Sequence, residues 1–166
     1  MQAQTVDIGT TVVNTTLIGQ GVSEDEANSI ANECLSGAAY IASKQSLRPK
    51  MLTVSVLNFS SEESAKQYLE LSEKIEKSAE AQVNASLNAS YKVIKNQTME
   101  MDGFDFVRYR YVDNTTNGVV TTTISAEGLI GSIYVGVGLV NMQEKITEDK
   151  ILEVMTTLNR ERLKML

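Results

Sequence analysis

Apolar residues recur at three- and four-residue spacing in three stretches of the chain, which is the pattern of amphipathic helices. The first stretch follows Ser23, and Glu26 stands three residues later as in a capping box. The pattern predicts a helix over residues 24–46 that ends before Pro49, the only proline. Its stripe consists of Ala27, Ile30, Ala31, Cys34, Leu35, Ala38, Ile41 and Ala42.

The second and third stretches predict a long helix and a C-terminal helix. The long helix covers residues 61–90, and Ser60 stands in the capping position before it, with Glu63 three residues later. Its middle is rich in Glu and Lys, with Glu70 and Lys74 at favourable i,i+4 spacing. We interpret that charged run as a solvated face. The last helix has Thr147 as its cap and continues to the end of the sequence. Its inner face consists of Ile151, Leu152, Met155, Leu158, Leu163 and Leu166.

Between these helices, apolar and polar residues alternate as they do in half-buried strands. Asp102-Gly103 is a hairpin signal, residues 113–118 form a polar turn, and Glu127-Gly128 is expected to close the last pair. Residues 1–21 favour a strand around Val12 and Val13 or a short helix. The predicted strands cover residues 51–59, 93–101, 104–112, 119–126 and 129–140.

The order of these elements predicts an α+β fold in a single domain over residues 1–166, in which residues 1–21 form a strand or an arm. We expect an antiparallel sheet of about five to six strands, including a four-strand meander. Two long helices and the C-terminal helix should cover it.

The composition narrows the class of partner. The 15 basic and 21 acidic residues give a net charge of −6, which disfavours nucleic acid because its phosphates are neutralised by Lys and Arg. The sequence starts with polar residues and contains no apolar run of about 18 residues, so we expect no membrane span. The chain is then either a cytoplasmic protein or a mature ectodomain from which a signal peptide or lipid anchor has been removed.

Six Asn-X-Ser/Thr triplets favour the ectodomain, because composition alone would give about two. Each is an acceptor for N-glycosylation if the chain is exported and the asparagine is exposed. Asn84 and Asn88 fall in the predicted long helix, which makes them weaker candidates for glycosylation. The remaining glycosylation candidates are Asn14, Asn58, Asn96 and Asn114.

Two further patterns suggest a binding surface. In the strand around Arg108 and Arg110, alternation puts both arginines on one face and two tyrosines on the other. They could form an anion site or an aromatic platform, but we favour an amphipathic strand with arginines in water and tyrosines under a helix. Gly136 and Gly138 leave a bare stripe on one strand face, where a helix packs closely, the sheet bends or a ligand approaches.

The residues needed for metal and acid–base chemistry are scarce. There is no histidine, and the single Cys34 lies in an apolar stripe, so we predict a core residue and neither a zinc site nor a nucleophile–base pair. Glu100, Asp102 and Asp105 surround a turn but lack the spacing of a calcium loop. We therefore expect no cofactor, no metal and no catalytic residue.

One resemblance is architectural. Residues 54–65, with sequence VSVLNFSSEESA, and residues 103–109, with sequence GFDFVRY, resemble exported lipoprotein-type domains of the PsbP-like α/β/α sandwich class. In that class, a strand that ends in an aromatic residue leads into a helix rich in small residues and acids. The likeness covers roughly residues 50–165 and implies a fold, but no functional residue.

These observations lead to a ranked set of functions. The first is a non-enzymatic exported or cell-surface domain, N-glycosylated, that binds a protein or glycan partner. The alternative is an intracellular carrier that holds a small apolar ligand between the sheet and the long helix, with seven methionines to line an adaptable pocket. A hydrolase built on carboxylates is disfavoured, because the acids lie mostly on predicted helix faces and caps.

Overall fold

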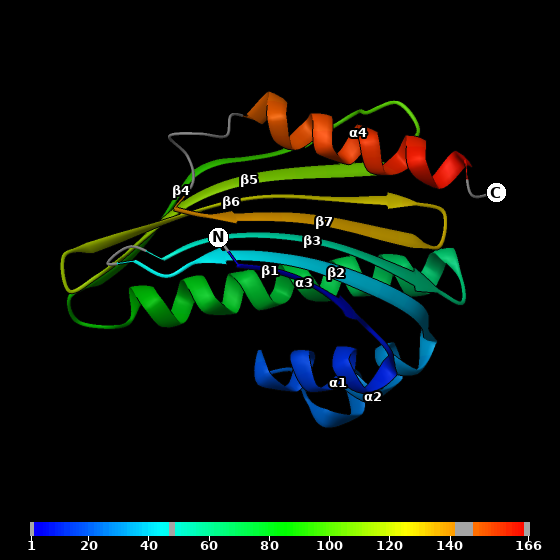
Figure 1. Ribbon diagram of the computed structural model, residues 1–166. Coiled ribbons are helices and arrows are strands. Elements are labelled where there is room, and N and C mark those ends of the chain that lie inside the picture. Colours follow the sequence, from blue (N-terminus) through cyan, green and yellow to red (C-terminus); the bar gives the residue numbers. More distant parts are fainter. Residues whose placement is uncertain (1, 47–48, 142–147, 165–166) are drawn as a thin grey trace.

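The computed structural model describes residues 2–46, 49–141 and 148–164, which form seven strands and four helices. All strands belong to one antiparallel sheet with the order β1-β2-β3-β7-β6-β5-β4 (Figure 1). The α+β class, the antiparallel sheet and its four-strand meander are confirmed, but the sheet has more strands than the five to six predicted. The strands are β1 (Gln2–Asp7), β2 (Cys34–Lys44), β3 (Lys50–Phe59), β4 (Ala89–Met99), β5 (Phe106–Thr116), β6 (Val119–Ile130) and β7 (Ile133–Val140).

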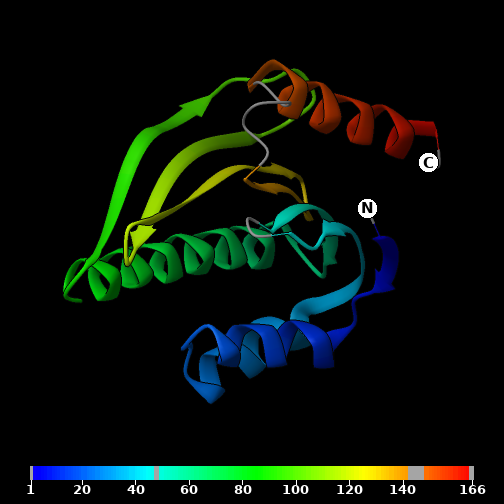
Figure 2. The ribbon, with the colours of Figure 1, turned by 60° about the vertical axis from the view of Figure 1, so that its left-hand side comes forward.

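Helices cover both faces of the sheet. In the orientation of Figure 1, α3 (Glu62–Asn84) and the pair α1 (Thr10–Gly19) and α2 (Glu24–Glu33) lie below the sheet, and α4 (Glu148–Lys164) lies above it. Figure 2 shows the same three layers from another side. We call these two sides of the sheet the lower and the upper face. Among the described residues, none of the helices is both long and apolar enough to cross a membrane.

Each face has its own apolar core. The lower core joins α1, α2 and α3 to the ends of β3, β6 and β7, and the upper core joins α4 to the middle of the sheet. Cys34 belongs to the lower core, as predicted, and is 3% exposed. Residues of the lower core include Leu57, Phe59, Leu69 and Tyr134, and those of the upper core include Val107, Tyr109, Leu139, Ile151 and Met155.

The helix predicted over residues 24–46 is wrong in its second half. Ser23 caps α2 as expected, since its Oγ accepts a hydrogen bond from the Glu26 amide at 3.3 Å, but α2 ends at Glu33. Residues 34–44 are strand β2, paired with β1 and β3. A run of small apolar residues fits both periodicities, and tertiary pairing decides between them. Gly37 permits this pairing, because a Cβ there would lie 2.6 Å from Leu57 Cδ2 and 2.9 Å from the Val56 carbonyl oxygen.

The long helix is also shorter than predicted. Its N-cap is Ser61, whose Oγ accepts a hydrogen bond from the Ser64 amide at 3.1 Å, and α3 ends at Asn84. The Asn84 side chain then accepts a hydrogen bond from the Tyr91 amide at 2.8 Å, which ties the helix end to the start of β4. Side chain–backbone competition of this kind is how Asn ends helices.

One predicted turn is shorter than expected, one lies elsewhere and one is a longer loop. Asn117 and Gly118, with φ of 50° and 78°, connect β5 to β6, which is the positive-φ pair that two-residue hairpins require. Glu127 and Gly128 lie inside β6, and the next turn is at Gly131, with φ of 55°. Asp102-Gly103 does lie between β4 and β5, in a loop longer than two residues.

The sequence pattern predicted the C-terminal helix better than the N-terminal segment. The N-terminal strand is β1, not the segment around Val12, and Val13 and Leu17 are buried residues of helix α1. At the other end, Ile151 and Met155 of α4 are buried as predicted. Thr147, Leu166 and the side chain of Leu163 lie outside the described part of the chain.

Candidate functional site

The four residues that the sequence marks as a binding surface lie together on the lower face. Arg108 is directly opposite Glu127 of β6, which is opposite Gly136 of β7. In the next row, Arg110 is opposite Ser125, which is opposite Gly138. Glu127 was expected in a turn, so its place in the centre of this group could not be found from local pattern.

Both arginines are buried, contrary to the expectation that they face water. Arg108 is 7% exposed and Arg110 is 5% exposed, because α3 crosses the sheet on their side. The tyrosines of the same strand do lie under a helix, since Tyr109 is buried in the upper core with Ile151 of α4. Alternation was therefore predicted well, and the position of α3 was not.

The acidic residues of α3 neutralise these arginines, so the charged run is not simply a solvated face. Arg108 pairs with Glu127, with Glu76 at 3.3 Å and with Glu73 at 3.5 Å. Arg110 pairs with Glu76 and, at 3.6 Å, with Glu80. Removing one partner from such a buried group leaves an uncompensated charge.

The Glu127 carboxylate accepts hydrogen bonds from three side chains of the network. Its Oε1 accepts hydrogen bonds from Tyr134 Oη at 2.7 Å and from Ser72 Oγ at 2.8 Å, and its Oε2 accepts one from Arg108. Burial raises the pKa of Tyr134 well above its usual value, and the charge of Glu127 adds to this, so the phenol stays a donor. The ring of Tyr68 packs edge-on against Tyr134 at 4.8 Å between centroids.

Burial also changes the acid–base behaviour of neighbouring groups. It raises the pKa of Tyr68 to about 12. Desolvation raises the pKa of Glu76 as well, and repulsion from Glu127 adds to the effect although both arginines oppose it. Glu73 differs, because the hydrogen bond from Lys77 lowers its pKa at the exposed side of α3. The pKa values of two acids of the same helix are thus shifted in opposite directions, because Glu76 is more deeply buried than Glu73.

The two glycines play different parts. A Cβ at Gly136 would lie 2.8 Å from both Tyr134 Oη and Ser55 Oγ, so this glycine lets the tyrosine reach across to Glu127. A Cβ at Gly138 would meet only Thr53 Oγ1, at 2.7 Å, within 4 Å among the described residues. Gly138 is half-buried, and no helix atom of the described residues lies within 4 Å of such a Cβ.

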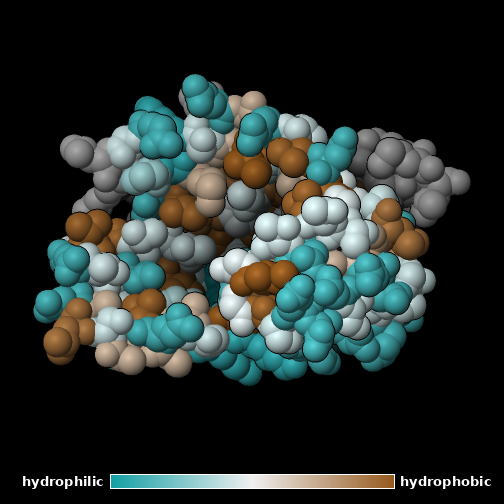
Figure 3. Space-filling view, turned by 90° about the horizontal axis from the view of Figure 1, so that it is seen from below, coloured by the Kyte–Doolittle hydropathy of each residue, from teal (hydrophilic) through white to brown (hydrophobic). Residues whose placement is uncertain are grey.

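An open strip of the lower face continues outward from Gly138. We call it the lower trough and define it by Gln4, Ile41, Thr53, Ser125 and Gly138, which share a face and are exposed or half-buried. Figure 3 shows a hollow on this side of the molecule, and a small cavity of about 130 Å³ lies at its outer end beside Gln2 and Gln4. At its inner end, Arg110 Nε is buried and has no hydrogen-bond partner within the described part of the chain.

A separate cleft lies between α3 and the sheet. It has a volume of about 360 Å³, and Leu69, Phe106 and Leu129 provide its apolar lining. Lys66 and Arg108 stand among its charged residues. This is the location that the carrier hypothesis requires.

The upper face carries a feature that sequence reasoning missed. We call it the upper platform and define it by six adjacent residues of β1, β2 and β3: Ala3, Thr5, Ala38, Tyr40, Val54 and Val56. None of them is charged, Tyr40 is 42% exposed, and Val54 and Val56 are half-buried. Helix α4 packs on β6 and β7, to one side of the platform (Figure 2). The mistaken helix over residues 24–46 concealed this surface.

The sequons differ in exposure. The amide of Asn14 donates to Asn28 Oδ1 at 2.7 Å, and Asn58 and Asn114 are half-buried in strands. Asn96 is exposed on the edge strand β4. Asn88, which the predicted helix had weakened, is exposed in a turn with φ of 63°. Asn84 is exposed as well, but its Oδ1 accepts from the Tyr91 amide, so Asn96 and Asn88 are the exposed acceptors that we favour.

Within residues 2–46, 49–141 and 148–164, no three potential ligands among His, Cys, Asp and Glu are placed to hold a metal ion. The acidic loop at residues 98–106 borders an open depression of about 700 Å³, but Asp105 is engaged, since its Oδ2 accepts from the Gly131 amide at 2.6 Å. No protein-family model matches this chain, and no curated protein matches it either.

Proposed function

We propose that this chain is a non-enzymatic binding domain, exported or at the cell surface, that docks a protein partner on the upper platform. The observation that carries the proposal is the exposure of Tyr40 among uncharged neighbours on a sheet face beside α4. Exposed apolar patches on soluble proteins mark interaction sites, and tyrosine is enriched at the centre of such interfaces.

The distribution of reactive groups supports a binding role over catalysis. Glu127, the most deeply placed acid of the lower network, already accepts from Tyr134, Ser72 and Arg108. A general acid or base must reach a substrate proton, whereas this carboxylate is buried and both of its oxygens already accept hydrogen bonds. Burial raises the pKa of the Cys34 thiol, which disfavours the thiolate that a nucleophile needs.

Export and glycosylation belong to the same proposal. Six sequons occur in the sequence, and Asn88 and Asn96 present exposed side chains. Peptide mass spectrometry of protein from its native host should find glycan on one or both. Unmodified asparagine at both positions would contradict the proposal of export and favour a cytoplasmic protein. The docking proposal has a separate test and would not be affected.

The docking proposal can be tested by site-specific photocrosslinking in the native host. A benzophenone amino acid at Tyr40 should form an adduct with one protein partner, because the side chain lies in the platform. The matched control is the same replacement at Leu87, which is 95% exposed but remote in the fold, in the α3–β4 connection. Equal adducts at both positions, or none at Tyr40, would contradict the proposal.

A glycan partner would need a different surface. Thr53 and Ser125 give the lower trough hydroxyl groups, and Arg110 Nε lies buried beside it without a partner in the described structure. A glycan array with the purified protein separates the two partners. Binding there that is lost in Thr53→Val and kept in Tyr40→Ala would assign the function to the trough instead.

A second candidate is the carrier of a small apolar ligand, which the cleft of about 360 Å³ between α3 and the sheet favours. Its volume lies within the range of small-molecule pockets. Native mass spectrometry of the purified protein should then show a small apolar adduct that Leu69→Trp excludes by filling the cleft. A protein free of any adduct, which also fails to bind a fatty acid such as palmitate, would remove this candidate.

A further inference from the structure

The two edges of the sheet differ in how well they resist pairing with another strand. At β4, the register with β5 is interrupted between Val93 and Lys95, and Lys92 and Lys95 add charge. Bulges and lysines are the devices by which proteins protect an edge. At β1, the register with β2 is regular over all six residues, and the only charge is Asp7 at the end of the strand.

The unprotected edge is also accessible. Five of the six residues of β1 are exposed and Val6 is half-buried. An edge strand presents unpaired backbone amide and carbonyl groups to any strand that can approach. Since β1 has neither proline nor a bulge in its register with β2, its outer edge is suited to antiparallel pairing.

We propose that this edge pairs with β1 of a second copy of the chain, around a two-fold axis normal to the sheet. Two residues that face each other across paired strands have side chains on the same face of the sheet. The two-fold axis must therefore lie where one residue of β1 faces the same residue of the second copy. With Gln4 opposite Gln4 of the second copy, Gln2 faces Val6 and Ala3 faces Thr5. The pairs formed within Gln2–Val6 are all neutral, and the two facing amides can bond to each other.

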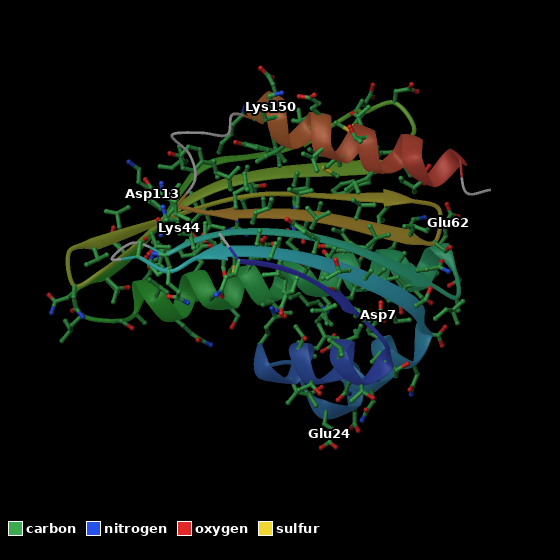
Figure 4. The ribbon with its side chains drawn as sticks, viewed as in Figure 1. Asp7, Glu24, Lys44, Glu62, Asp113 and Lys150 are labelled. Carbon is green, nitrogen blue, oxygen red and sulfur yellow. The ribbon has the colours of Figure 1, made fainter. Side chains whose placement is uncertain are left out.

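Charge complementarity favours a second copy in this register. Lys44 and Asp7 lie on the upper face at opposite ends of the β1–β2 pair (Figure 4). The two-fold axis places Lys44 of each copy in the same row as Asp7 of the other, two strand spacings or about 10 Å apart between backbones. Long lysine side chains can cross much of that distance, and the bridge forms twice.

The pairing has a consequence for the surfaces described above. Ala3 and Thr5 belong to the upper platform, so the two platforms become continuous across the new strand pair. Gln4 likewise joins the two lower troughs. The second copy therefore contributes residues to each surface, while the pairing itself depends on neither the protein partner nor export.

Cysteine crosslinking tests both the dimer and its register. In Gln4→Cys the two introduced residues face each other across paired strands, about 4.5–5.5 Å apart between Cα atoms, which a disulfide can span. Mild oxidation should give a covalent dimer within the full chain. Gln2→Cys is the matched control, because its two copies are offset by four residues, about 13 Å. The native Cys34 is buried and does not contribute.

Sedimentation velocity gives an independent readout. Gln4→Lys places two like charges directly opposite and should raise the dimer dissociation constant about fivefold or more. Thr98→Lys makes the same charge change at an exposed position of β4 and should leave the dimer unchanged. Three results would overturn the inference: a wild-type protein that stays monomeric at about 100 µM, a dimer dissociation constant unchanged by Gln4→Lys, or equal crosslinking of both cysteine variants. None of these results would affect the photocrosslinking test at Tyr40.

Discussion

The two faces of the sheet are covered by helices that are held in different ways. Below the sheet, α3 is attached through Arg108, Arg110 and their acidic partners, in addition to its apolar contacts. Above it, α4 packs through Ile151 and Met155, and its polar anchor is Glu148, which accepts from Gln97 Nε2 at 2.9 Å and pairs with Lys95. One strand supplies both chemistries, because β5 sends arginines downward and tyrosines upward.

This difference teaches that a buried charge network on one face of a sheet can coexist with an uncharged, apolar core on the opposite face. Alternation keeps the two sets of side chains on opposite sides of the backbone. The lower helix should therefore respond to loss of charge, and the upper helix to loss of volume. The following substitutions test that contrast.

The largest effect is expected for Arg108→Met. The change leaves Glu127 buried without its ion-pair partner, which costs about 3–5 kcal/mol of unfolding free energy. Urea denaturation measures it. The double variant Arg108→Met with Glu127→Gln removes both charges and should recover part of the loss. If the double variant is no more stable than the single one, the loss in Arg108→Met does not come from the unpaired charge of Glu127.

Met155→Ala should be next in size. Met155 is fully buried under α4, and its Cε would lie 2.8 Å from a Cβ at Gly128, so the side chain fills a close contact with the sheet. Truncation leaves a cavity and costs about 2–4 kcal/mol. The same denaturation experiment at low and high salt should give equal losses. A salt-dependent loss would contradict an apolar attachment.

Substitution of the two glycines of the lower face should destabilise the protein by different amounts. Gly136→Ala displaces the Tyr134 hydroxyl from Glu127 and should cost about 1–3 kcal/mol through overpacking and a weakened hydrogen bond. Gly138→Ala meets only the Thr53 hydroxyl within the described structure and should cost less than about 1 kcal/mol. Thermal unfolding of the two variants side by side measures the difference. Equal costs would mean that Tyr134 does not depend on Gly136.

The smallest effect concerns pH. Because the pKa of Glu76 is raised in the folded protein, the folded state takes up this proton more readily than the unfolded chain. The contribution of Glu76 to stability is therefore fully present below the unfolded glutamate pKa of about 4.3 and is lost as pH rises through the folded value. Relative to Glu76→Gln, the wild type should thus lose stability as the pH rises above about 4. A difference that grows more favourable with rising pH would reverse the sign.

Several elements could be predicted because their signals are local. The cap at Ser23, strand β3, the meander and helix α4 each follow from spacing and side-chain chemistry within a few residues. The second half of the helix predicted over 24–46 could not, because small apolar residues such as Ala38 and Ala42 suit a helix stripe as well as a strand. Pairing with β1 and β3, which no local pattern contains, makes it β2.

The candidate surfaces divide in the same way. Arg108, Arg110, Gly136 and Gly138 were identified from the sequence and do lie together, but the arginines are buried and do not face water as expected. Their burial depends on where α3 crosses the sheet, and the upper platform depends on β2 being a strand. Both are relations between segments far apart in the chain.

Sequence by itself determined the alternation of strands such as β3 and β5, the cap at Ser23 and the absence of histidine, since these depend only on residue identity and spacing. Tertiary structure alone decided that Glu127 and Glu76 neutralise two arginines, that Gly136 makes room for Tyr134, and that β1 forms an open edge. The physical reason is that burial, ion pairing and edge exposure are set by which surfaces meet, and those surfaces come from segments separated by dozens of residues.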